Sequence, residues 1–556
     1  MSAIAEHGGI AEHIHPEPQG FIRKYVFSLD HKIIGIQYII TAFVFFVLAG
    51  CLAELMRIQL MHANGGFLSP DTYNEIYSVH GSAMVWLVII PILTGGFGNL
   101  VMPVQIGARD VAFPWLNMIS FWIFPISGLM LFSSFLMGAP VAGWTEYPPM
   151  SLQGAAGTSM WCAAIFLVGV SSTLTGMNFL VTMLKMRAPG MTFTRMPLFV
   201  WGQLATAPLL MIATTALAAA LAALFMERQF GVPFYDPTRG GSPVLWQHMF
   251  WFYSHPAVYI MILPAFGIMS EVISVFSRKT VFGYRLIAFS SAAIALTGFM
   301  VWAHHMFTSG IAPYMQLPFM IITYIIAVPT GVKIFSWVAT MFRGKIHLTV
   351  SMLFALGFLV LFTFGGISGV FLAAIPFDLH VHGTYFIPAH LHYVLVGGSL
   401  MGVFSGIYFW FPKMTGRFMS ETWGRVHFVL FVIGFTGTFL PMHYLGAQGM
   451  PRRVATYDPQ FQGINQFESY CSFIMTLAIL IFFINVLYSI RHGKPAGHNP
   501  WRARTLEWMI PSPMPYYNFK HIPAVYGLPY DFRQPLPYKH LEEELTDAPE
   551  PVGAAH

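Results

Sequence analysis

The chain has 556 residues, of which 56% are hydrophobic and only 9% are charged. Soluble domains carry about 25% charged residues, so this composition excludes an ordinary soluble protein and indicates a membrane protein with many helices. The formal net charge of +5 is small and suggests no nucleic-acid partner. The three cysteines lie far apart and form no CxxC motif, so neither a disulfide framework nor a thiolate metal site is indicated.

Apolar stretches recur along the whole chain, and most exceed the roughly 20 residues that a helix needs to cross a bilayer. No cleavable signal peptide is expected before the first stretch, because the first 20 residues are polar and rich in histidine. We predict an all-α integral membrane protein with twelve transmembrane helices, at residues 33–60, 80–103, 113–137, 157–185, 197–226, 246–276, 283–308, 314–342, 350–376, 384–411, 426–446 and 467–490.

Basic residues divide unevenly between the loops. One side holds Arg23, Lys24, Lys185, Arg187, Arg278, Lys279, Arg343, Lys345, Lys413, Arg417, Arg491 and Lys494. The other side holds mainly Arg228, Arg239, Arg452 and Arg453. The positive-inside rule then predicts that both termini lie in the cytoplasm. We expect a cytoplasmic N-terminal tail at 1–25, a membrane domain at 26–495 and a Pro-rich cytoplasmic tail at 496–556.

Six histidines lie inside the apolar stretches: His80, His255, His304, His305, His390 and His392. A buried imidazole costs free energy unless its ring nitrogens have partners, and a neutral imidazole is the commonest metal ligand. A single histidine in such a place is more often a hydrogen-bonded core residue than a ligand. Six of them together indicate bound metal at membrane depth.

The spacing of these histidines gives further detail. His390 and His392 are two residues apart, so on a helix their rings point to opposite sides and could serve two different metal centres. His255 and Tyr259 are four residues apart and share one helical face. His304 and His305 form an adjacent pair.

These histidines stand in longer motifs: Val79-His80-Gly81, Gly95-Gly96-Phe97-Gly98-Asn99, His255-Pro256 through Tyr259, His304-His305, His390-Leu391-His392 and Gly449-Met450-Pro451-Arg452-Arg453. With this set in this order, the chain resembles subunit I of the haem–copper terminal oxidases, the A-type cytochrome c oxidases in particular, over about residues 20 to 530. The resemblance implies a proton-pumping respiratory enzyme that reduces O₂ to water with electrons from a c-type cytochrome.

The resemblance also implies where the chain is located and which subunits it contacts. It would work in the cytoplasmic (inner) membrane of a bacterium, in contact with membrane lipid and with oxidase subunits II and III. The chain has no cysteine pair for a dinuclear copper site through which electrons enter, so such a site would belong to another subunit.

For the haems, the resemblance assigns His80 and His392 as the two axial ligands of a low-spin haem, which leaves no open iron position and suits electron transfer. It assigns His390 as the proximal ligand of a high-spin haem whose other face is free for oxygen. Haem a is implied for both, although the sequence leaves haems o and b open.

For copper, the resemblance assigns His255, His304 and His305 as the ligands of one ion that faces the high-spin haem. Three imidazoles suit copper and leave room for an oxygen species. Tyr259 would be joined covalently to His255 and would supply an electron and a proton when the O–O bond is cleaved.

Four further residues are implied to contact the haems: Arg57, Trp144, Arg452 and Arg453. Arg452 and Arg453 would pair with haem propionates, where a guanidinium group fits a carboxylate. Arg57 would lie near the formyl group of a haem.

A Mg²⁺ ion bound by Asp378 and His382 is only weakly implied. Relatives follow the equivalent of His382 with an aspartate, and this chain has Gly383 there. Mg²⁺ prefers oxygen ligands, so His382 alone would be a poor site.

One predicted proton channel centres on Lys333, which lies in the middle of an apolar stretch. A charged residue at membrane depth is expensive and therefore a functional candidate. Thr323, Thr330 and Ser336 are expected around it, and the resemblance implies that this channel leads toward Tyr259.

The resemblance places the mouth of a second proton channel at Asp110, in a loop on the cytoplasmic side. Asn99, Asn117 and Asn178 would order water in this channel. Without the resemblance, Asp110 would be read as an ordinary surface acid.

The second channel departs from the family pattern at its inner end. Most close relatives carry a glutamate two residues after the first copper histidine, where this chain has Ala257. Tyr253 and Ser254 precede that histidine, and Tyr253 shares a helical face with Ala257. We predict that Tyr253 relays protons in place of the glutamate, with Ser254 in support.

Other functions are weighed against this one. Within the family, a quinol oxidase would need polar and charged groups where this chain has Leu48, Leu52 and Thr72, and nitric oxide reductases lack the histidine–tyrosine pair and the lysine channel. From a different class, a twelve-helix secondary transporter fits the hydropathy but has no need for six intramembrane histidines.

Overall fold

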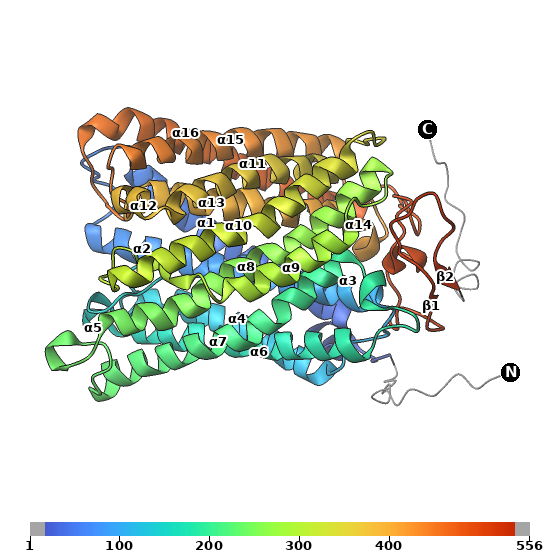
Figure 1. The fold of residues 1–556 in the computed structure, drawn as a ribbon, viewed down its shortest axis with the longest axis horizontal. Coiled ribbons are helices and arrows are strands. Elements are labelled where there is room, and N and C mark those ends of the chain that lie inside the picture. Colours follow the sequence, from blue (N-terminus) through green and yellow to red (C-terminus); the bar gives the residue numbers. More distant parts are fainter. Residues whose placement is uncertain (1–16, 540–556) are drawn as a thin grey trace.

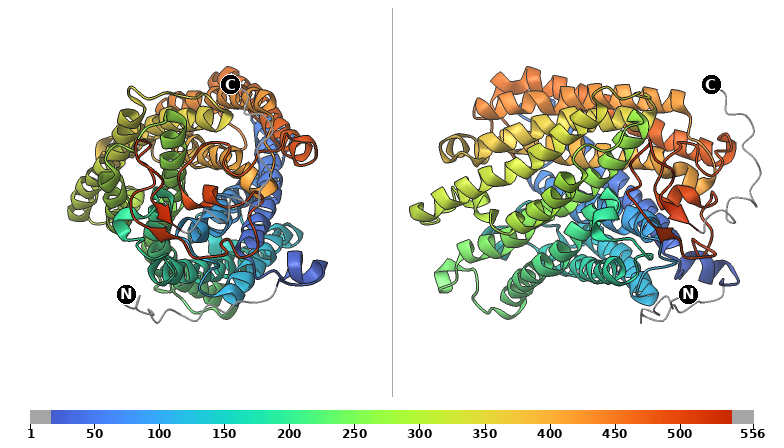
Figure 2. Two further views of the ribbon diagram at one scale, coloured as in Figure 1. Left: turned by 90° about the vertical axis from the view of Figure 1, so that its right-hand side faces the viewer. Right: turned by 45° about the vertical axis from the view of Figure 1, so that its right-hand side comes forward.

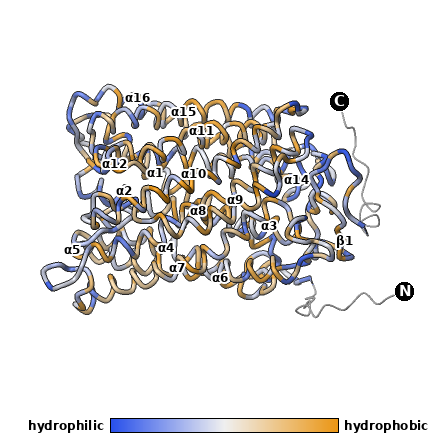
Figure 3. The backbone as a smooth tube through the Cα atoms, in the orientation of Figure 1, coloured by the Kyte–Doolittle hydropathy of each residue, from blue (hydrophilic) through white to orange (hydrophobic). Residues whose placement is uncertain are grey.

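Long apolar helices run side by side along the longest axis of the molecule (Figure 1). The structure is a computed structural model that describes residues 17–539. Residues 1–16 and 540–556, which include most of the expected N-terminal tail and the last part of the C-terminal tail, lie outside the described residues. Hydrophobic residues predominate along the middle of the bundle, and hydrophilic residues are more frequent toward its two ends (Figure 3).

Eleven helical spans of the described chain are long and apolar enough to cross a membrane. They are α1 (His31–Gln59), the span Pro70–Gln105 with α2 (Pro70–Ala83) and α3 (Phe97–Gln105), α4 (Pro114–Ser133) with its extension to Met137, α6 (Ala156–Lys185), α7 (Leu198–Phe230), α8 (Pro243–Ser277), α10 (Pro313–Met341), α11 (Val350–Ala373), the span Phe386–Thr415 with α13 (Phe386–Val394) and α14 (Met401–Thr415), α15 (Glu421–Ala447) and α16 (Gln462–His492) with its first turn at Pro459–Phe461. Two short helices, α5 (Met150–Gln153) and α12 (Ile375–Val381), lie between spans.

The predicted span 283–308 is the exception to the expected count of twelve. It forms α9 (Tyr284–Gly298), which has 15 residues, and then a 3-10 segment at Trp302–Met306. A Cβ atom at Gly298, the last residue of α9, would lie 2.8 Å from Cδ2 of Tyr259, so a glycine there lets the helix pack close to that ring. Eleven of the twelve predicted spans are therefore long enough to cross a membrane among the described residues, and the all-α membrane fold class is as predicted.

The two ends of the bundle differ. The end that we call the tail end carries residues 17–30 and 496–539, including the antiparallel strands β1 (Ala524–Val525) and β2 (Tyr538–Lys539). Figure 2 shows the 496–539 segment lying across this end of the bundle. The opposite end, which we call the loop end, carries α5, α12 and the loops at 138–149 and 448–458.

Polar side chains fix where several spans begin. Each accepts a backbone N–H group of the first turn, which has no carbonyl partner within its own helix. These capping residues are Asp30, Ser69, Ser242, Thr349 and Ser420. Proline at the first helical position of α2, α4, α8 and α10 adds a backbone angle that already suits a helix.

Candidate metal centres and proton routes

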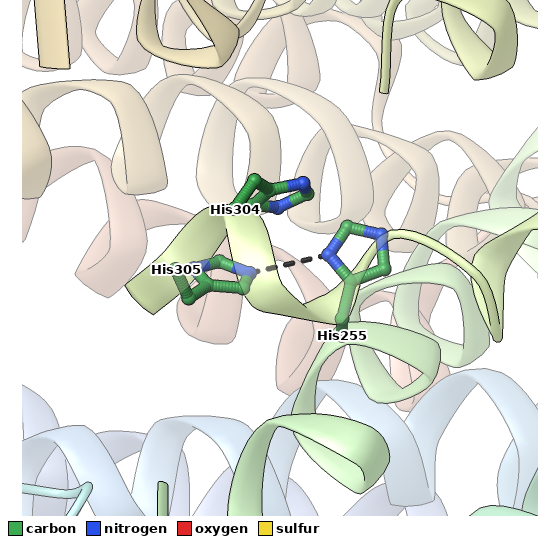
Figure 4. A group of neighbouring side chains, drawn as sticks. All are labelled: His255, His304 and His305. Carbon is green, nitrogen blue, oxygen red and sulfur yellow. Dashed lines mark hydrogen bonds between the residues drawn. The ribbon is translucent and has the colours of Figure 1, made fainter. Parts of the chain in front are cut away.

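Three histidines from two elements face one another inside the bundle (Figure 4). His255 comes from α8, and His304 and His305 come from the 3-10 segment that follows α9. One ring nitrogen from each lies within 4.8 Å of the others, and Nδ1 of His255 is 3.2 Å from Nε2 of His305. Among residues 17–539 no other group of three or more histidine, cysteine or acidic side chains converges in this way. The cluster offers one metal ion three imidazole ligands.

The protonation of His304 follows from its surroundings. The Thr323 hydroxyl donates to the carbonyl oxygen of Phe319 at 2.5 Å and lies 2.9 Å from Nδ1 of His304. Because that hydroxyl proton is already used, Thr323 accepts a hydrogen bond from the Nδ1–H group of His304, which leaves Nε2 with its lone pair. A second hydrogen bond that fixes the ring is typical of metal-binding histidines.

Aromatic rings hold the cluster from two sides. The Trp251 ring stacks on His305 with centroids 3.7 Å apart and planes 10° apart. The Tyr259 ring lies 4.7 Å from the His255 ring, as expected for two residues on one face of α8. Nε2 of His255 is buried and has no hydrogen-bond partner among the described residues. The predicted bond between His255 and Tyr259 stays a prediction.

His80 and His392 are each fixed by a backbone carbonyl. Nδ1 of His80 lies 2.8 Å from the carbonyl oxygen of Ala49, and Nδ1 of His392 lies 2.7 Å from that of Pro388. A carbonyl only accepts, so both rings carry their proton on Nδ1 and present Nε2 as a lone pair. The His392 ring also stacks on Phe439 at 4.1 Å. Both side chains are thus oriented as metal ligands.

His390 is held in the same manner by α11. Its Nδ1 lies 3.1 Å from the carbonyl oxygen of Gly365 and 3.0 Å from Oγ of Ser368. A Cβ atom at Gly369 would lie 2.9 Å from Cε1 of this ring, so a glycine there lets α11 approach. The Nε2 lone pair of His390 is again left for a metal.

The loop end carries two arginines with unused hydrogen-bond donors, Arg452 and Arg453. The Arg452 guanidinium makes no hydrogen bond or ion pair with any residue in 17–539, although burial lowers its pKa to about 10. Arg453 makes only long bonds of 3.4 Å, to the carbonyl oxygen of Ala142 and to Oγ1 of Thr145. Guanidinium groups with unused donors fit carboxylates such as haem propionates. The residues present therefore fit the predicted haems and copper.

Arg57 is more tightly bound than the sequence suggests. Its guanidinium lies 3.2 Å from Oε2 of Glu468 and donates to Oγ of Ser469 at 3.0 Å and to the carbonyl oxygen of Asn465 at 2.7 Å. Sequence reasoning missed Glu468, although a glutamate inside an apolar stretch was a signal that could have found it. A role for Arg57 at a haem stays a prediction.

Asp378 and His382 meet as predicted, but they bond to each other. Oδ2 of Asp378 lies 3.0 Å from Nδ1 of His382, one helical turn away. No third ligand from residues 17–539 joins them. The pair gives a Mg²⁺ ion one carboxylate and one imidazole at most, which does not fit an ion that seeks about six oxygens.

Lys333 is buried, and its partners come from α9. Nζ donates to Oγ of Ser291 at 2.6 Å and to the carbonyl oxygen of Ile287 at 2.9 Å. The predicted neighbour Thr330 donates to a carbonyl of its own helix instead. Sequence reasoning missed Ser291 because a serine in an apolar stretch gives no signal without its partner.

Two other residues of this predicted route also differ from expectation. Thr323 lies beside His304, at the metal end of the route and not beside the lysine. Ser336 lies near Gly283, at the start of α9. The route as a whole stays a prediction.

Asp110 lies at the tail end, in the loop between α3 and α4. Removal from water raises its pKa to about 8, and the negative charge of Asp30 adds to this effect, while Lys32 opposes it. His31 and Asn518 join the same corner, since the Asn518 amide donates to Nε2 of His31 at 2.9 Å. Sequence reasoning missed both, because Asn518 is more than 400 residues from the loop that it contacts.

The three predicted asparagines follow Asp110 into the bundle. Asn117 donates to Oδ1 of Asn99 at 2.7 Å, and Oδ1 of Asn117 is buried with no partner among the described residues. Oδ1 of Asn178 accepts the backbone N–H of Phe113 at 2.9 Å, and Nδ2 of Asn178 donates to the carbonyl oxygen of Phe113 at 3.2 Å. The structure thus brings Asn99 and Asn117 together and sets Asn178 against the loop.

Tyr253 and Ser254 are both buried at the inner end of this route. The Tyr253 hydroxyl accepts a hydrogen bond from Nε1 of Trp86 at 3.1 Å, so its own proton remains free to donate. The Ser254 hydroxyl has no partner among residues 17–539. The Trp86 ring packs on Trp144, with centroids 5.8 Å apart. A relay through Tyr253 stays a prediction.

Comparison with known proteins agrees with this arrangement. Residues 33–511 match the family model described as "Cytochrome C and Quinol oxidase polypeptide I". The chain is 52% identical over 519 residues to cytochrome c oxidase subunit 1 of Thermostichus vulcanus, covering 93% of this chain and 94% of that one. It is 45% identical over 510 residues to the Bacillus subtilis (strain 168) protein of the same name, and the match covers 91% of this chain and 82% of that one.

A solved structure has the same fold at lower sequence similarity. A chain of a haem–copper terminal oxidase dimer superposes with a TM-score of 0.72 at 20% identity, covering 84% of both chains. The fold, the histidine cluster and the relatives agree: the chain belongs to the cytochrome c and quinol oxidase polypeptide I family.

Proposed function

We propose that this chain is the catalytic subunit of a cytochrome c oxidase, which reduces O₂ to water with electrons from a c-type cytochrome and pumps protons. The observation that carries the proposal is the placement of the six histidines. Hydrogen bonds at Nδ1 of His80, His304, His390 and His392 leave Nε2 of each of these rings with its lone pair, and His255 and His305 join His304 in the three-histidine cluster. The names of the curated relatives support the electron donor.

Within this proposal the histidines hold the metals. His80 and His392 hold a low-spin haem, His390 a high-spin haem, and His255 with the adjacent pair His304 and His305 a copper ion. When bound, these groups supply electrons to O₂. The protein orients their ligands, excludes water and delivers protons through Lys333 and Asp110. We propose haem a for both haems and no Mg²⁺ at Asp378.

The setting is part of the same proposal. The tail end faces the cytoplasm, because most loop lysines and arginines lie there. The chain works in a bacterial cytoplasmic membrane together with oxidase subunits II and III.

One spectrum and one donor comparison test this function. Purified complex should show low-spin and high-spin haem bands in a reduced-minus-oxidised difference spectrum. Metal analysis should find one copper ion for this chain in addition to any copper that the partner subunits hold. Oxygen consumption should be fast with reduced c-type cytochrome and slow with a quinol. Faster turnover with quinol would show that the electron donor is a quinol and not a c-type cytochrome. Absence of haem would overturn the whole proposal.

A further inference from the structure

A buried carboxyl group outside the predicted routes lies at the loop end. Glu146 belongs to the loop at 138–149, between α4 and α5, and its side chain is 0% exposed. Its backbone φ is 41°, in a region that residues other than glycine seldom adopt. The fold therefore holds this glutamate in one fixed place away from water.

Only one of its two oxygens has a partner. Oε1 accepts the backbone N–H of Ala142 at 2.9 Å, and Oε2 is buried with no hydrogen-bond partner among residues 17–539. The nearby arginines direct their donors elsewhere. Arg453 bonds to Ala142 and Thr145, and Arg228 bonds to Ser159 and to carbonyl oxygens of the loop that contains α5. The carboxyl group thus has a free oxygen and no ion pair within the described chain.

Charged and titratable groups face Glu146 from four elements: Arg228 from α7, Arg453 from the 448–458 loop, Cys162 from α6 and Tyr77 from α2. Burial is the largest influence and raises the pKa of Glu146 to about 8, while the Ala142 N–H and the two arginines act in the opposite direction. A buried carboxyl without an ion pair favours the neutral form. At neutral pH this group holds a proton.

Glu146 also lies beyond the end of the Asp110 route. The Tyr253 hydroxyl accepts from Trp86, and the Trp86 ring packs on Trp144, which is two residues before Glu146 in the same loop. A short layer of tryptophan rings therefore separates the predicted relay from this carboxyl group. On the proposed orientation, Glu146 is on the outer side of that layer.

We infer that Glu146 is a proton-holding site on the outer side of the enzyme, which accepts protons that have passed Tyr253 and releases them to the external water. In each cycle an O–H bond forms at Oε2 and breaks again when the proton leaves, so no electron moves at this residue. The inference rests on the proposed proton pumping.

The variant Glu146→Gln separates this role from a structural one. A glutamine Oε1 still accepts the Ala142 N–H and keeps the loop in place, but the side chain cannot release a proton. In the complete oxidase complex reconstituted into vesicles, we expect oxygen consumption to persist while protons released per electron fall toward zero. Infrared spectra at pH 7 should lose one protonated-carboxyl C=O band, which in the unmodified protein disappears as pH rises through about 8.

A matched control exists at the same end of the bundle. Glu227 is 4% exposed, but both its oxygens accept backbone N–H groups, from Tyr235 at 2.7 Å and Asp236 at 3.0 Å, and Arg239 lies 3.5 Å away. Glu227→Gln should leave the infrared band and the pumping unchanged.

The outcomes also separate this inference from the proposed function. Unmodified vesicles that consume O₂ without releasing any protons would remove the pumping on which the inference rests. Unmodified vesicles that pump, together with equal pumping or an unchanged infrared band in Glu146→Gln, would overturn the inference alone.

Discussion

The histidine centres and the proton routes are held in different ways. His80 and His390 are fixed by backbone carbonyls of neighbouring helices, and His392 by a carbonyl of its own helix α13. Lys333 and Tyr253 each have a side-chain partner, Ser291 and Trp86, and Lys333 also donates to the carbonyl oxygen of Ile287. A metal ligand needs one fixed geometry, whereas a proton carrier must exchange partners.

This difference predicts how each region responds to change. Removing a ligand from a fixed cluster destroys the site, because no other group can move into its place. Removing one member of a proton route slows transfer, because water can partly replace a side chain. The following substitutions test the contrast, from the largest expected effect to the smallest.

His304→Ala should remove copper and essentially all oxygen consumption, while both haems stay. The reason is that two histidines cannot hold the ion in the geometry set by α8 and the 3-10 segment. Metal analysis of purified protein measures this directly. His248→Asn changes another α8 histidine outside the cluster and should keep its copper. Normal copper in the His304 variant would contradict the assignment.

Lys333→Met should slow reduction of the high-spin haem by roughly 10²–10⁴-fold, the usual contribution of a positioned proton carrier. The low-spin haem should still reduce at its normal rate, which stopped-flow spectroscopy can follow. Lys413→Met is the control, because Lys413 is also buried but donates to Ile510 at the tail end, away from this route. Turnover near that of the unmodified protein would count against the lysine route.

Thr323→Val should weaken copper binding by roughly 10–100-fold, the typical effect of losing the partner that orients a metal-binding histidine. Thr323→Ser keeps the hydroxyl and should bind copper normally. Copper retention during dialysis against a chelator measures the difference. If valine and serine behave alike, Thr323 does not orient His304.

Tyr253→Phe should lower turnover or protons pumped per electron by a few-fold, with unchanged haem spectra. The ring stays in place and only the hydroxyl that accepts from Trp86 is lost. The double variant with Ser254→Ala should show the larger defect. Full pumping in both variants would mean that water alone bridges the gap left by Ala257.

Besides its role in the proposed proton route, Asp110 should affect stability, and the stability change in Asp110→Asn is the smallest effect expected in this series. Folding raises the pKa of Asp110 from 3.8 to about 8, so the folded chain keeps a proton that the unfolded chain releases. Stability of the unmodified protein therefore falls as pH rises between these values. The Tm of the variant relative to the unmodified protein should rise from pH 5 to pH 8. A Tm difference that does not change with pH would contradict the shift.

The sequence predicted the helices because apolar stretches leave a local pattern. It also predicted the convergence of His255, His304 and His305, while their binding of metal stays a prediction. An apolar stretch longer than 20 residues, and a histidine inside it, can each be recognised from that stretch of sequence alone. The exception was 283–308, where the helix ends at Gly298 and a 3-10 segment follows, which the run of apolar residues does not reveal.

The residues that hydrogen-bond or pair with the side chains of the candidate site could not be predicted from the sequence. Ser291 beside Lys333, Glu468 beside Arg57 and Asn518 beside His31 each come from an element remote in sequence. Serine and asparagine are common in every helix and loop, so their type carries no signal until the packing is known. Thr323 was predicted to lie near Lys333 but contacts His304. The position of a residue along a helix does not tell which neighbouring element that side of the helix packs against.

The contacts of the tail with the first helix bear on how the protein is made. Lys32 donates to the carbonyl oxygen of Tyr516 at 2.7 Å and to Oδ1 of Asn518 at 3.0 Å, so the Asp110 corner is built from the first and last parts of the chain. A ribosome produces these parts hundreds of residues apart. The corner therefore closes only after synthesis of the whole membrane domain, and an unfinished chain has no completed mouth for proton uptake.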